Sequence, residues 1–261
     1  MSKYFQSYYG FGKSLYSEND YKRAIGQLKN ALYFHDFAGF NKADSINYLI
    51  GISYSKVADY GLSSRYLALI SKQDSILYGK AVFQSGKNYF LINNFDSAIL
   101  YCESFSDKLS SKKYSQNLTL LLASSYLMLN KTELASRVLY NADLSSSRLL
   151  KYSTEIENFK PKNPFLAGAL SAIVPGSGKF YTKNIGHGLM ALFLNGLLAY
   201  RTVIEYNRGG VSSTGFIIFG TIFLITYTAN IIGSIFSAKQ YNRRHYNAIH
   251  SKVTDFIYEF D

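Results

Sequence analysis

The chain has 261 residues and a formal net charge of +11, from 28 Lys and Arg against 17 Asp and Glu. A chain of this length can form two domains. Its single cysteine, Cys102, excludes an intramolecular disulfide and a structural metal site built from cysteines. The basic excess suits contact with anionic lipid headgroups, an acidic partner or nucleic acid, and much of it flanks apolar segments that we expect to lie in a membrane.

The first twenty residues, MSKYFQSYYGFGKSLYSEND, contain no apolar stretch and no small-residue cleavage site of the kind that a secretory signal needs. We therefore expect the N-terminal domain to fold in the cytoplasm, where it is made. A signal preceding this sequence would instead place that domain outside, in the periplasm.

A pattern recurs four times, over residues 12–32, 51–70, 86–105 and 123–142, whose first positions are separated by 39, 35 and 37 residues. These intervals are close to the roughly 34 residues of a helix–turn–helix repeat. Each copy has a small residue, an aromatic residue or Leu three positions later, and a second small residue where the second helix begins to pack. In order, these are Gly12, Leu15 and Ala24; Gly51, Tyr54 and Ser63; Gly86, Tyr89 and Ala98; and Ala123, Tyr126 and Ala135. The small residues are predicted to let two helices approach closely.

This skeleton resembles the tetratricopeptide repeat family over residues 4–142, although the usual Trp and the terminating Pro are absent. The resemblance implies an all-α fold, with a solenoid of about four repeats at residues 1–144. Residues 145–160 are expected to form a capping helix and a linker, because a solenoid end needs a polar outer face. An ordinary helical bundle with accidental periodicity is the alternative.

Stacked repeats of this kind form a concave inner face, mostly from the first helix of each repeat. The register predicts aromatic residues and lysines on that face: Tyr9, Lys13, Tyr16, Tyr48, Lys56, Lys80, Phe83, Lys87 and Phe90. Aromatic side chains supply rigid contact area, and lysines attract acidic side chains or a C-terminal carboxylate. We interpret this surface as a groove for a protein or peptide partner, with a solvated helix face as the alternative. Nothing in it indicates base readout, so we expect no nucleic-acid partner.

The second part of the chain, residues 161–245, is predicted to be a membrane domain. Residues 188–206 carry charge only near their end, and residues 211–237 contain no Asp, Glu, Lys or Arg. A spanning helix needs roughly 20 apolar residues, so both stretches qualify. Residues 165–174 are too short to span upright and are expected to form a re-entrant or interfacial helix. Residues 246–261 are expected to be a basic, amphipathic tail.

A turn motif lies between the short helix and the first spanning helix. It consists of Pro175, Gly176, Gly178 and Tyr181, followed by Gly186 and Gly188. Pro ends a helix and Gly permits a tight turn. Lys179 follows Gly178, but the segment is not a phosphate loop, because Ile173 and Phe180 stand where that motif needs Gly and Ser or Thr.

Together with Asn195 and the run Tyr241-Asn242-Arg243, this motif resembles a small bacterial membrane domain that accompanies tetratricopeptide repeats in Bacteroidetes and related bacteria. In some relatives a similar module accompanies the membrane-protein-insertion efficiency factor. The resemblance implies a role in the cell envelope, in the bacterial inner membrane. It brings no established activity with it.

Two polar residues, Asn195 and Asn230, lie within the predicted spanning helices. We expect them to hydrogen-bond to each other or across an oligomer contact. Small residues on both helices would allow a homo-oligomer to form by close helix packing in lipid. Arg201 and Glu205 are one helical turn apart and are expected to form an ion pair.

The tail after the second spanning helix is basic, with Lys239, Arg243, Arg244 and Lys252. The positive-inside rule therefore places the tail in the cytoplasm, and two spanning helices place the repeat domain there as well. Arg208, between the two helices, conflicts mildly with this orientation.

No nucleophile–base pair, paired carboxylates or metal-ligand cluster emerges from the spacing, and His245 and His250 are wrongly spaced to meet on a helix. We therefore expect no enzymatic activity, no cofactor and no metal. The sequence favours a membrane-anchored adaptor for protein–protein interaction that assists membrane or envelope protein assembly. The alternative is an accessory or pore-forming subunit of a small oligomeric membrane transporter.

Overall fold

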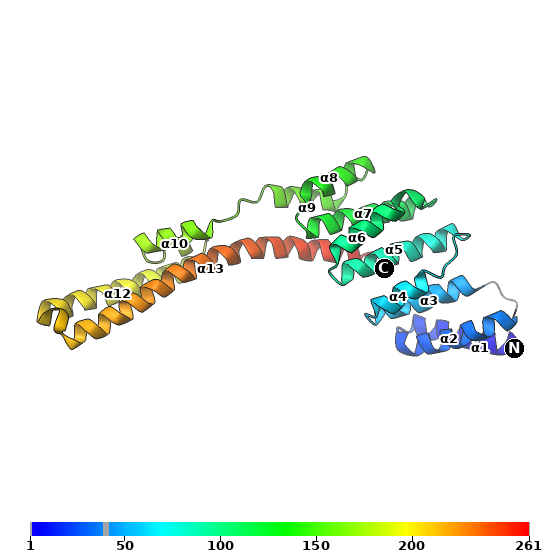
Figure 1. Cartoon of the computed structure of the whole chain (residues 1–261), viewed down its shortest axis with the longest axis horizontal. Coiled ribbons are helices and arrows are strands. Elements are labelled where there is room, and N and C mark those ends of the chain that lie inside the picture. The colour runs from blue at the N-terminus through cyan, green and yellow to red at the C-terminus, as the bar shows by residue number, and fades with distance from the viewer. Residues whose placement is uncertain (1, 39–41, 261) are drawn as a thin grey trace. The chain divides into compact units, whose positions relative to one another are not determined.

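The computed structural model describes residues 2–38 and 42–260, and in these residues it contains helices and no β-strand (Figure 1). The all-α fold class is thereby confirmed. The chain divides into two compact units. Unit 1 comprises Met1–Glu157 together with His250–Asp261, and unit 2 comprises Asn158–Ile249.

Unit 1 is built from consecutive helices, each of which packs against the next. They are α1 (Ser2–Ser17), α2 (Tyr21–Ala38), α3 (Ala43–Lys56), α4 (Tyr60–Leu67), α5 (Ser75–Leu91), α6 (Phe95–Phe105), the 3-10 turn η1 (Ser106–Lys108), α7 (Lys112–Met128), α8 (Thr132–Asn141) and α9 (Arg148–Glu157). The odd-numbered helices also contact one another in order, α1 with α3, α3 with α5, α5 with α7 and α7 with α9. They therefore form a continuous layer.

Small residues bring the two helices of a pair together, as the sequence predicts. A Cβ atom at Gly12 would lie 2.9 Å from Cγ of Leu28 on α2, and one at Gly51 would lie 2.7 Å from Cγ of Leu67 on α4. Leu28 is fully buried and Leu67 nearly so. At Gly86 the nearest atom of the paired helix α6 is Cδ1 of Tyr101 at 3.3 Å, and a methyl carbon of Leu121 on the next first helix, α7, is nearer still at 3.0 Å. A larger side chain at these positions would push the helices apart.

A left-handed residue ends the first helix of each of the first four pairs. These residues are Asn19, Ala58, Asn93 and Asn130, with φ of 63°, 63°, 59° and 56°. They recur at intervals of 39, 35 and 37, the intervals of the sequence repeat. In each case the next N–H donates to the carbonyl five residues earlier: Asp20 to Leu15, Asp59 to Tyr54, Asn94 to Tyr89 and Lys131 to Tyr126, at 2.8–3.0 Å. This is a Schellman-type helix end, which satisfies carbonyls that the helix leaves open.

The residue after the left-handed position also starts the second helix in three of these pairs. Side-chain oxygens of Asp20, Asp59 and Asn94 accept from the N–H groups three residues ahead, at 3.1–3.2 Å. Such N-caps satisfy open donors at a helix start. Two adjacent residues thus end one helix and begin the next.

Ala58 is the one residue of the four left-handed positions that is neither Asn nor Gly, and a left-handed conformation is unfavourable for Ala by about 1 kcal/mol. We expect Ala58→Gly to raise the free energy of unfolding of unit 1 by about 0.5–1 kcal/mol. Urea unfolding of the detergent-solubilised chain, followed by far-UV circular dichroism, measures it. Ala68→Gly is the matched control, since Ala68 is exposed with φ of −68° and should lose stability on the same change. Equal losses in both variants would contradict the argument.

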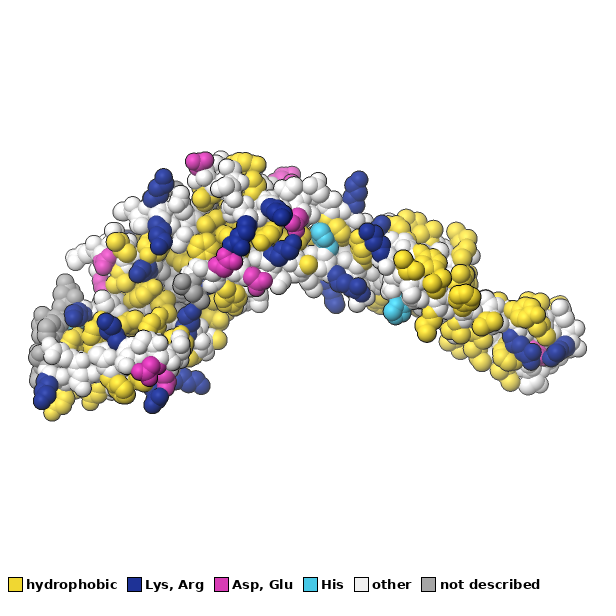
Figure 2. Space-filling model, turned by 180° about the vertical axis from the view of Figure 1, so that it is seen from behind, with side chains coloured by type: hydrophobic (Ala, Val, Ile, Leu, Met, Phe, Trp, Pro, Cys, Tyr) yellow, Lys and Arg dark blue, Asp and Glu magenta, His cyan; other side chains and the backbone are white. Residues whose placement is uncertain are grey.

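Unit 2 contains α10 (Pro164–Ile173), α11 (Ser177–Tyr181), α12 (Ile185–Gly209), η2 (Gly210–Ser212) and most of α13 (Thr214–Tyr258). The segments Ile185–Ser212 and Thr214–Tyr258 are long and apolar enough to cross a membrane, whereas α10 is shorter. Large apolar side chains, including Met190, Phe193, Leu197, Leu224 and Ile225, stand exposed on α12 and α13. Figure 2 shows hydrophobic side chains gathered over this unit and charged ones scattered over unit 1. A helix surface of this kind suits lipid rather than water.

The turn between α10 and α12 is packed too closely for any side chain. Gly176 has φ of +89°, and a Cβ atom there would lie 2.2 Å from the carbonyl oxygen of Gly188. A Cβ atom at Gly178 would lie 1.8 Å from the carbonyl oxygen of Ala167, and one at Gly188 would lie 2.4 Å from the ring of Phe180. These glycines therefore hold α10, α11 and α12 in direct backbone contact.

Hydroxyl groups tie the same turn to α13. The N–H of Gly178 donates to Oγ of Ser171 at 2.9 Å, and that oxygen lies 2.7 Å from Oγ of Ser234. The hydroxyl of Tyr227 donates to the carbonyl of Ala172 at 2.5 Å. Backbone groups left open by the turn thus find partners inside the unit.

We expect Gly178→Ala to destabilise unit 2 by about 3 kcal/mol, the upper end of the usual cost of overpacking, because the added methyl group meets backbone rather than a movable side chain. Gly186→Ala is the control, since nothing lies within 4 Å of a Cβ atom there. The measurement is the fraction recovered as a monodisperse peak after extraction in mild detergent. Normal recovery of Gly178→Ala would contradict the close packing of the turn.

Candidate functional site

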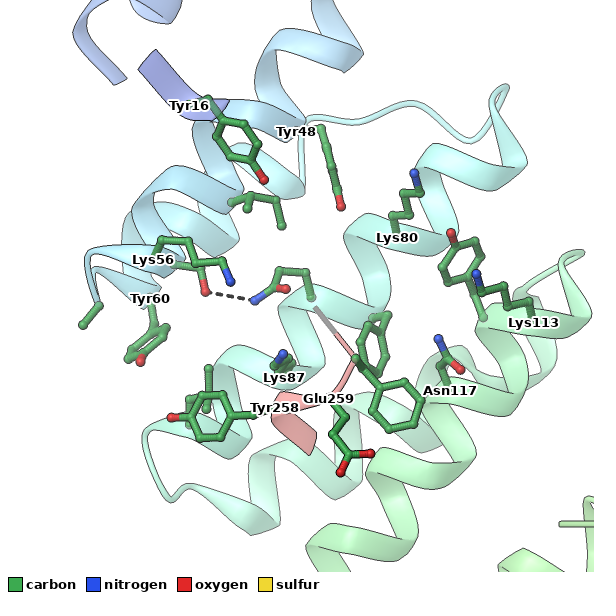
Figure 3. Close-up of a pocket in the computed structure, with 18 residues that line it drawn as sticks. Tyr16, Tyr48, Lys56, Tyr60, Lys80, Lys87, Lys113, Asn117, Tyr258 and Glu259 are labelled. Carbon is green, nitrogen blue, oxygen red and sulfur yellow. Dashed lines mark hydrogen bonds between the residues drawn. The ribbon is translucent and has the colours of Figure 1, made fainter. Parts of the chain in front are cut away.

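Unit 1 contains a pocket with a volume of about 670 Å³ (Figure 3). Its walls come mainly from the odd-numbered helices α1, α3, α5 and α7, from the start of α4, and from residues 258–260. The layer formed by the first helix of each pair therefore carries the cavity.

The pocket is strongly basic. Its described lining residues include four lysines, Lys56, Lys80, Lys87 and Lys113, and one carboxylate, Glu259. The Arg148 guanidinium donates to that carboxylate, with Nη1 at 3.1 Å from Oε1, and these hydrogen bonds lower the pKa of Glu259. The carboxylate is thus already matched by a cation from outside the lining. A surface with this balance attracts acidic groups.

Aromatic rings orient three of the four lysines. The Nζ atoms of Lys80, Lys87 and Lys113 lie 5.9, 5.8 and 5.9 Å from the ring centroids of Tyr48, Tyr258 and Tyr114, respectively. A cation over the face of a ring is attracted by the ring's quadrupole. In Figure 3, Lys56 on α3 and Lys80 on α5 lie on opposite sides of the cavity. The ammonium groups are therefore held around an opening rather than spread over one helix.

A saturated polar network supports the side of the pocket formed by α3, α4 and α5. The buried amide of Asn88 accepts from Ser55 and Gln84 at 3.0 Å each, and donates to Ser63 at 2.9 Å and Ser64 at 3.1 Å. Gln84 also donates to Ser55 at 2.9 Å. A fully satisfied buried network fixes its members in place. Ser55 and Gln84, which line the cavity, are consequently rigid.

The C-terminal segment of the chain belongs to this unit. Val253 and Ile257 are fully buried, and Lys252 forms an ion pair with Glu155 of α9 at 3.0 Å. The ring of Phe260 lies 5.8 Å from that of Phe83 on α5. Residues 253–260 therefore run from the α9 side of unit 1 to the pocket.

Tyr258 closes one side of the cavity beside Lys87, which is only 1% exposed. Tyr60, at the start of α4, lines the same side, and burial raises the pKa of its phenol, with a smaller contribution from Tyr258. The C-terminal residues thus cover the buried end of the pocket.

Six of the nine residues predicted for the groove line the pocket: Tyr16, Tyr48, Lys56, Lys80, Phe83 and Lys87. Tyr9 and Lys13 lie outside its lining, where Tyr9 stacks on Phe5 at 5.8 Å and the Nζ of Lys13 lies 5.6 Å from the Tyr9 ring. Phe90 does not point into the cavity. It is 2% exposed and packs edge-on against Phe95, with ring centroids 5.2 Å apart.

The other lining residues are not predicted by the sequence: Ile52, Ser55, Ala58, Tyr60, Gln84, Leu91, Lys113, Tyr114, Asn117 and residues 258–260. Asn117 could have been found, because it follows Lys80 by 37 residues, the interval from Gly86 to Ala123. Nothing in the local sequence marks residues 258–260 as part of a site on helices that begin more than a hundred residues earlier.

In unit 2 the structure brings Gly176, Gly178 and Gly188 together in the turn described above. Pro175 precedes the left-handed Gly176, and Tyr181 accepts a hydrogen bond from the N–H of Asn163 at 3.2 Å. Gly186 does not join this contact, since it is exposed with open space around it.

Asn195 and Asn230 do not hydrogen-bond to each other, so the first of the two expected arrangements is wrong, and a contact across an oligomer stays a prediction. Asn195 donates to the carbonyl of Ala191 at 2.8 Å and accepts from Thr226 at 3.3 Å. The side chain of Asn230 is buried and has no hydrogen-bond partner among the described residues. The expected pair of Arg201 with Glu205 is present at 2.6 Å, and Arg208 joins the same carboxylate at 3.3 Å.

Comparison of the chain with protein families, curated proteins and solved structures finds no match. The basis for a proposed function is therefore the chemistry of the pocket and the two helices that are long and apolar enough to cross a membrane. Cys102 contributes nothing to that chemistry, because it is buried and burial raises the pKa of its thiol far above neutrality.

Proposed function

We propose that the chain is a membrane-anchored adaptor, in which a tetratricopeptide-type repeat domain holds a segment of a partner protein. The observation that carries this proposal is the basic, aromatic pocket on the layer of first helices. The proposed clients are proteins being assembled in the bacterial inner membrane or the envelope.

The regularity of the helix pairs supports the repeat assignment. Four left-handed residues, four identical helix ends and four small residues all recur at 39, 35 and 37 positions. In an ordinary bundle there is no reason for turn geometry to follow the intervals of the packing residues. Stacked helix pairs of this kind commonly present an extended binding surface.

The pocket has the chemistry of a binding site rather than of a catalyst. Among its described lining residues the ionisable groups are lysines, tyrosines and Glu259, and Glu259 is held by Arg148. General acid–base work needs a group that is free to exchange protons near the operating pH. Rigid aromatic faces and oriented ammonium groups instead favour the capture of a segment that is partly apolar and partly acidic.

The contacts within unit 1 bear on membrane topology. Arg148 and Glu155 precede the apolar helices, and their ion-pair partners Glu259 and Lys252 follow them. These contacts support an arrangement in which both ends lie on the same side of a membrane that α12 and α13 cross. An even number of crossings favours a non-spanning α10, and the basic residues after the second apolar stretch favour the cytoplasm as that side.

The alternative, a pore-forming or accessory transporter subunit, gains little support from the polar residues of unit 2. Asn195 is 2% exposed, and its side chain hydrogen-bonds to the carbonyl of Ala191 and to the hydroxyl of Thr226 in its own chain. It is therefore not available to line an open pathway in this conformation. Glu205 is likewise occupied, by Arg201 and Arg208.

A photo-crosslinking residue in place of Tyr48, inside the pocket, is expected to capture partner proteins in native membranes. Lys80→Glu and Lys113→Glu should each reduce that yield at least about fivefold, since each reverses one charge facing the opening. Mass spectrometry of the crosslinked bands identifies the partners.

Lys151→Glu is the matched control, because Lys151 is an exposed lysine on α9 outside the pocket lining and its reversal should leave the yield unchanged. The same crosslinker at the exposed Tyr140 on α8 controls for proximity. An adaptor pocket is excluded if crosslinkers at positions 48 and 140 give the same products, or if Lys80→Glu and Lys113→Glu leave the crosslinking yield from position 48 unchanged.

Topology is tested with single cysteines in a Cys102→Ser background, at the exposed residues Lys151, Ser212 and Ser251. In intact cells an impermeant maleimide is expected to label position 212 and to spare positions 151 and 251 until the cells are lysed. Labelling of 151 together with protection of 251 would mean that α10 crosses the membrane, and the two-span arrangement would be wrong.

A further inference from the structure

We propose that residues 258–260 are a built-in ligand of the pocket, and that an acidic, aromatic segment of a partner protein binds by displacing them. This inference rests on the proposed adaptor function and adds its ligand chemistry and its regulation. The juxtaposition behind it is the packing of Tyr258 against Lys87 and of Phe260 against Phe83, in a pocket that four lysines line.

Two of the three residues contact the lining itself. The Tyr258 ring lies 5.8 Å from the Lys87 ammonium, and the Phe260 ring lies 5.8 Å from the Phe83 ring. Glu259 also lines the pocket, but it accepts from Arg148, which lies outside the lining. The chain itself thus shows that the cavity accepts aromatic side chains, and the acidic character of the ligand is argued from the lysines that remain.

These residues cover only one end of the cavity. Lys80 and Lys113 remain exposed, and in Figure 3 both lie well away from Tyr258. Lys113, with Lys112, stands in the first turn of α7, where the helix macrodipole disfavours positive charge. A second acidic group, supplied by a partner, would relieve this arrangement. We therefore assign the displacing ligand as a segment with at least two carboxylates flanking aromatic residues.

Residues 258–260 are held less firmly than the segment before them, although Phe260 is half-buried, with its ring near those of Phe83 and Phe256. Val253 and Ile257 are fully buried, whereas Tyr258 is 51% exposed and Glu259 is exposed. Helix α13 ends at Tyr258, and the N–H groups of Glu259 and Phe260 reach back to carbonyls at 3.3 and 3.4 Å. An exposed ion pair adds little holding strength. The last residues can leave while the buried part of the helix stays in place.

The test uses the full chain in detergent and a fluorescein-labelled peptide with the sequence of residues 255–261, DFIYEFD, read by fluorescence anisotropy. The variant is Phe260→Ser, which removes the contact with Phe83 from a residue that lies beyond the helix end. The control is Phe11→Ser, which removes an exposed aromatic ring outside the pocket. A peptide with Asn and Gln in place of its Asp and Glu residues controls for charge.

We expect the peptide to bind Phe260→Ser about tenfold more tightly than the wild-type chain, because the apparent affinity falls with the fraction of pockets that are already occupied. Phe11→Ser should match the wild type. The double variant Phe260→Ser/Lys80→Glu should lose the gain, and the uncharged peptide should bind weakly to all of them.

Equal binding by the wild type and Phe260→Ser would overturn the built-in ligand, and equal binding of the uncharged peptide would overturn the acidic specificity. Absence of binding to both chains would overturn the inference too. In each of these cases Lys80-dependent crosslinking from position 48 in membranes would leave the adaptor function standing. Loss of that crosslinking removes the function itself, so the two failures are distinguishable.

Discussion

The first helix of each of the first four pairs ends in a backbone hydrogen bond from an N–H to the carbonyl five residues earlier. This bond requires a residue with positive φ just before the donor. Because this turn is the same each time, the same face of each first helix remains uncovered by its partner. Tyr48 and Phe83 both precede their helix-packing glycine by three residues, and Ile52 and Lys87 both follow it by one. All four line the pocket. The cavity is therefore a consequence of the repeated turn, and the side chains at those positions determine what it binds.

Two lysines at the start of α7 work against local stability. Lys112 and Lys113 stand in the first turn, where positive charge opposes the helix dipole, and Lys113 lines the pocket. Sequences are locally consistent in most places and depart from that consistency where function demands it. This departure beside the cavity supports the proposal that the binding site lies there.

Much of this arrangement can be predicted from the sequence, because the repeat fixes which residues share a helix face. Tyr16, Tyr48 and Lys80 follow from the register alone. Phe90 was misplaced because a buried helix has apolar residues on more than one face, and its side chain turns toward Phe95 on the paired helix. The hydrogen-bond partners of Asn195 and Asn230 cannot be predicted either. The sequence indicates how far along its helix each residue lies, but not how the two helices are rotated relative to each other. Residues 258–260 escape prediction altogether, because a contact between distant segments leaves no local pattern.

The covalent link between the C-terminal residues and the pocket changes the energetics of competition. A tethered ligand has an effective concentration in the millimolar range, so weak contacts suffice to keep it in place. To compete, the free concentration of a partner must exceed the effective concentration of the tethered residues divided by the ratio of the two affinities. A second carboxylate that reaches Lys80 or Lys113 raises the partner's affinity and so lowers the concentration that it needs. The buried residues Val253 and Ile257 keep the tether short whether or not the pocket is open. Under the proposed displacement, such a cavity would exclude apolar segments without carboxylates and admit those whose acidic groups fit the remaining lysines.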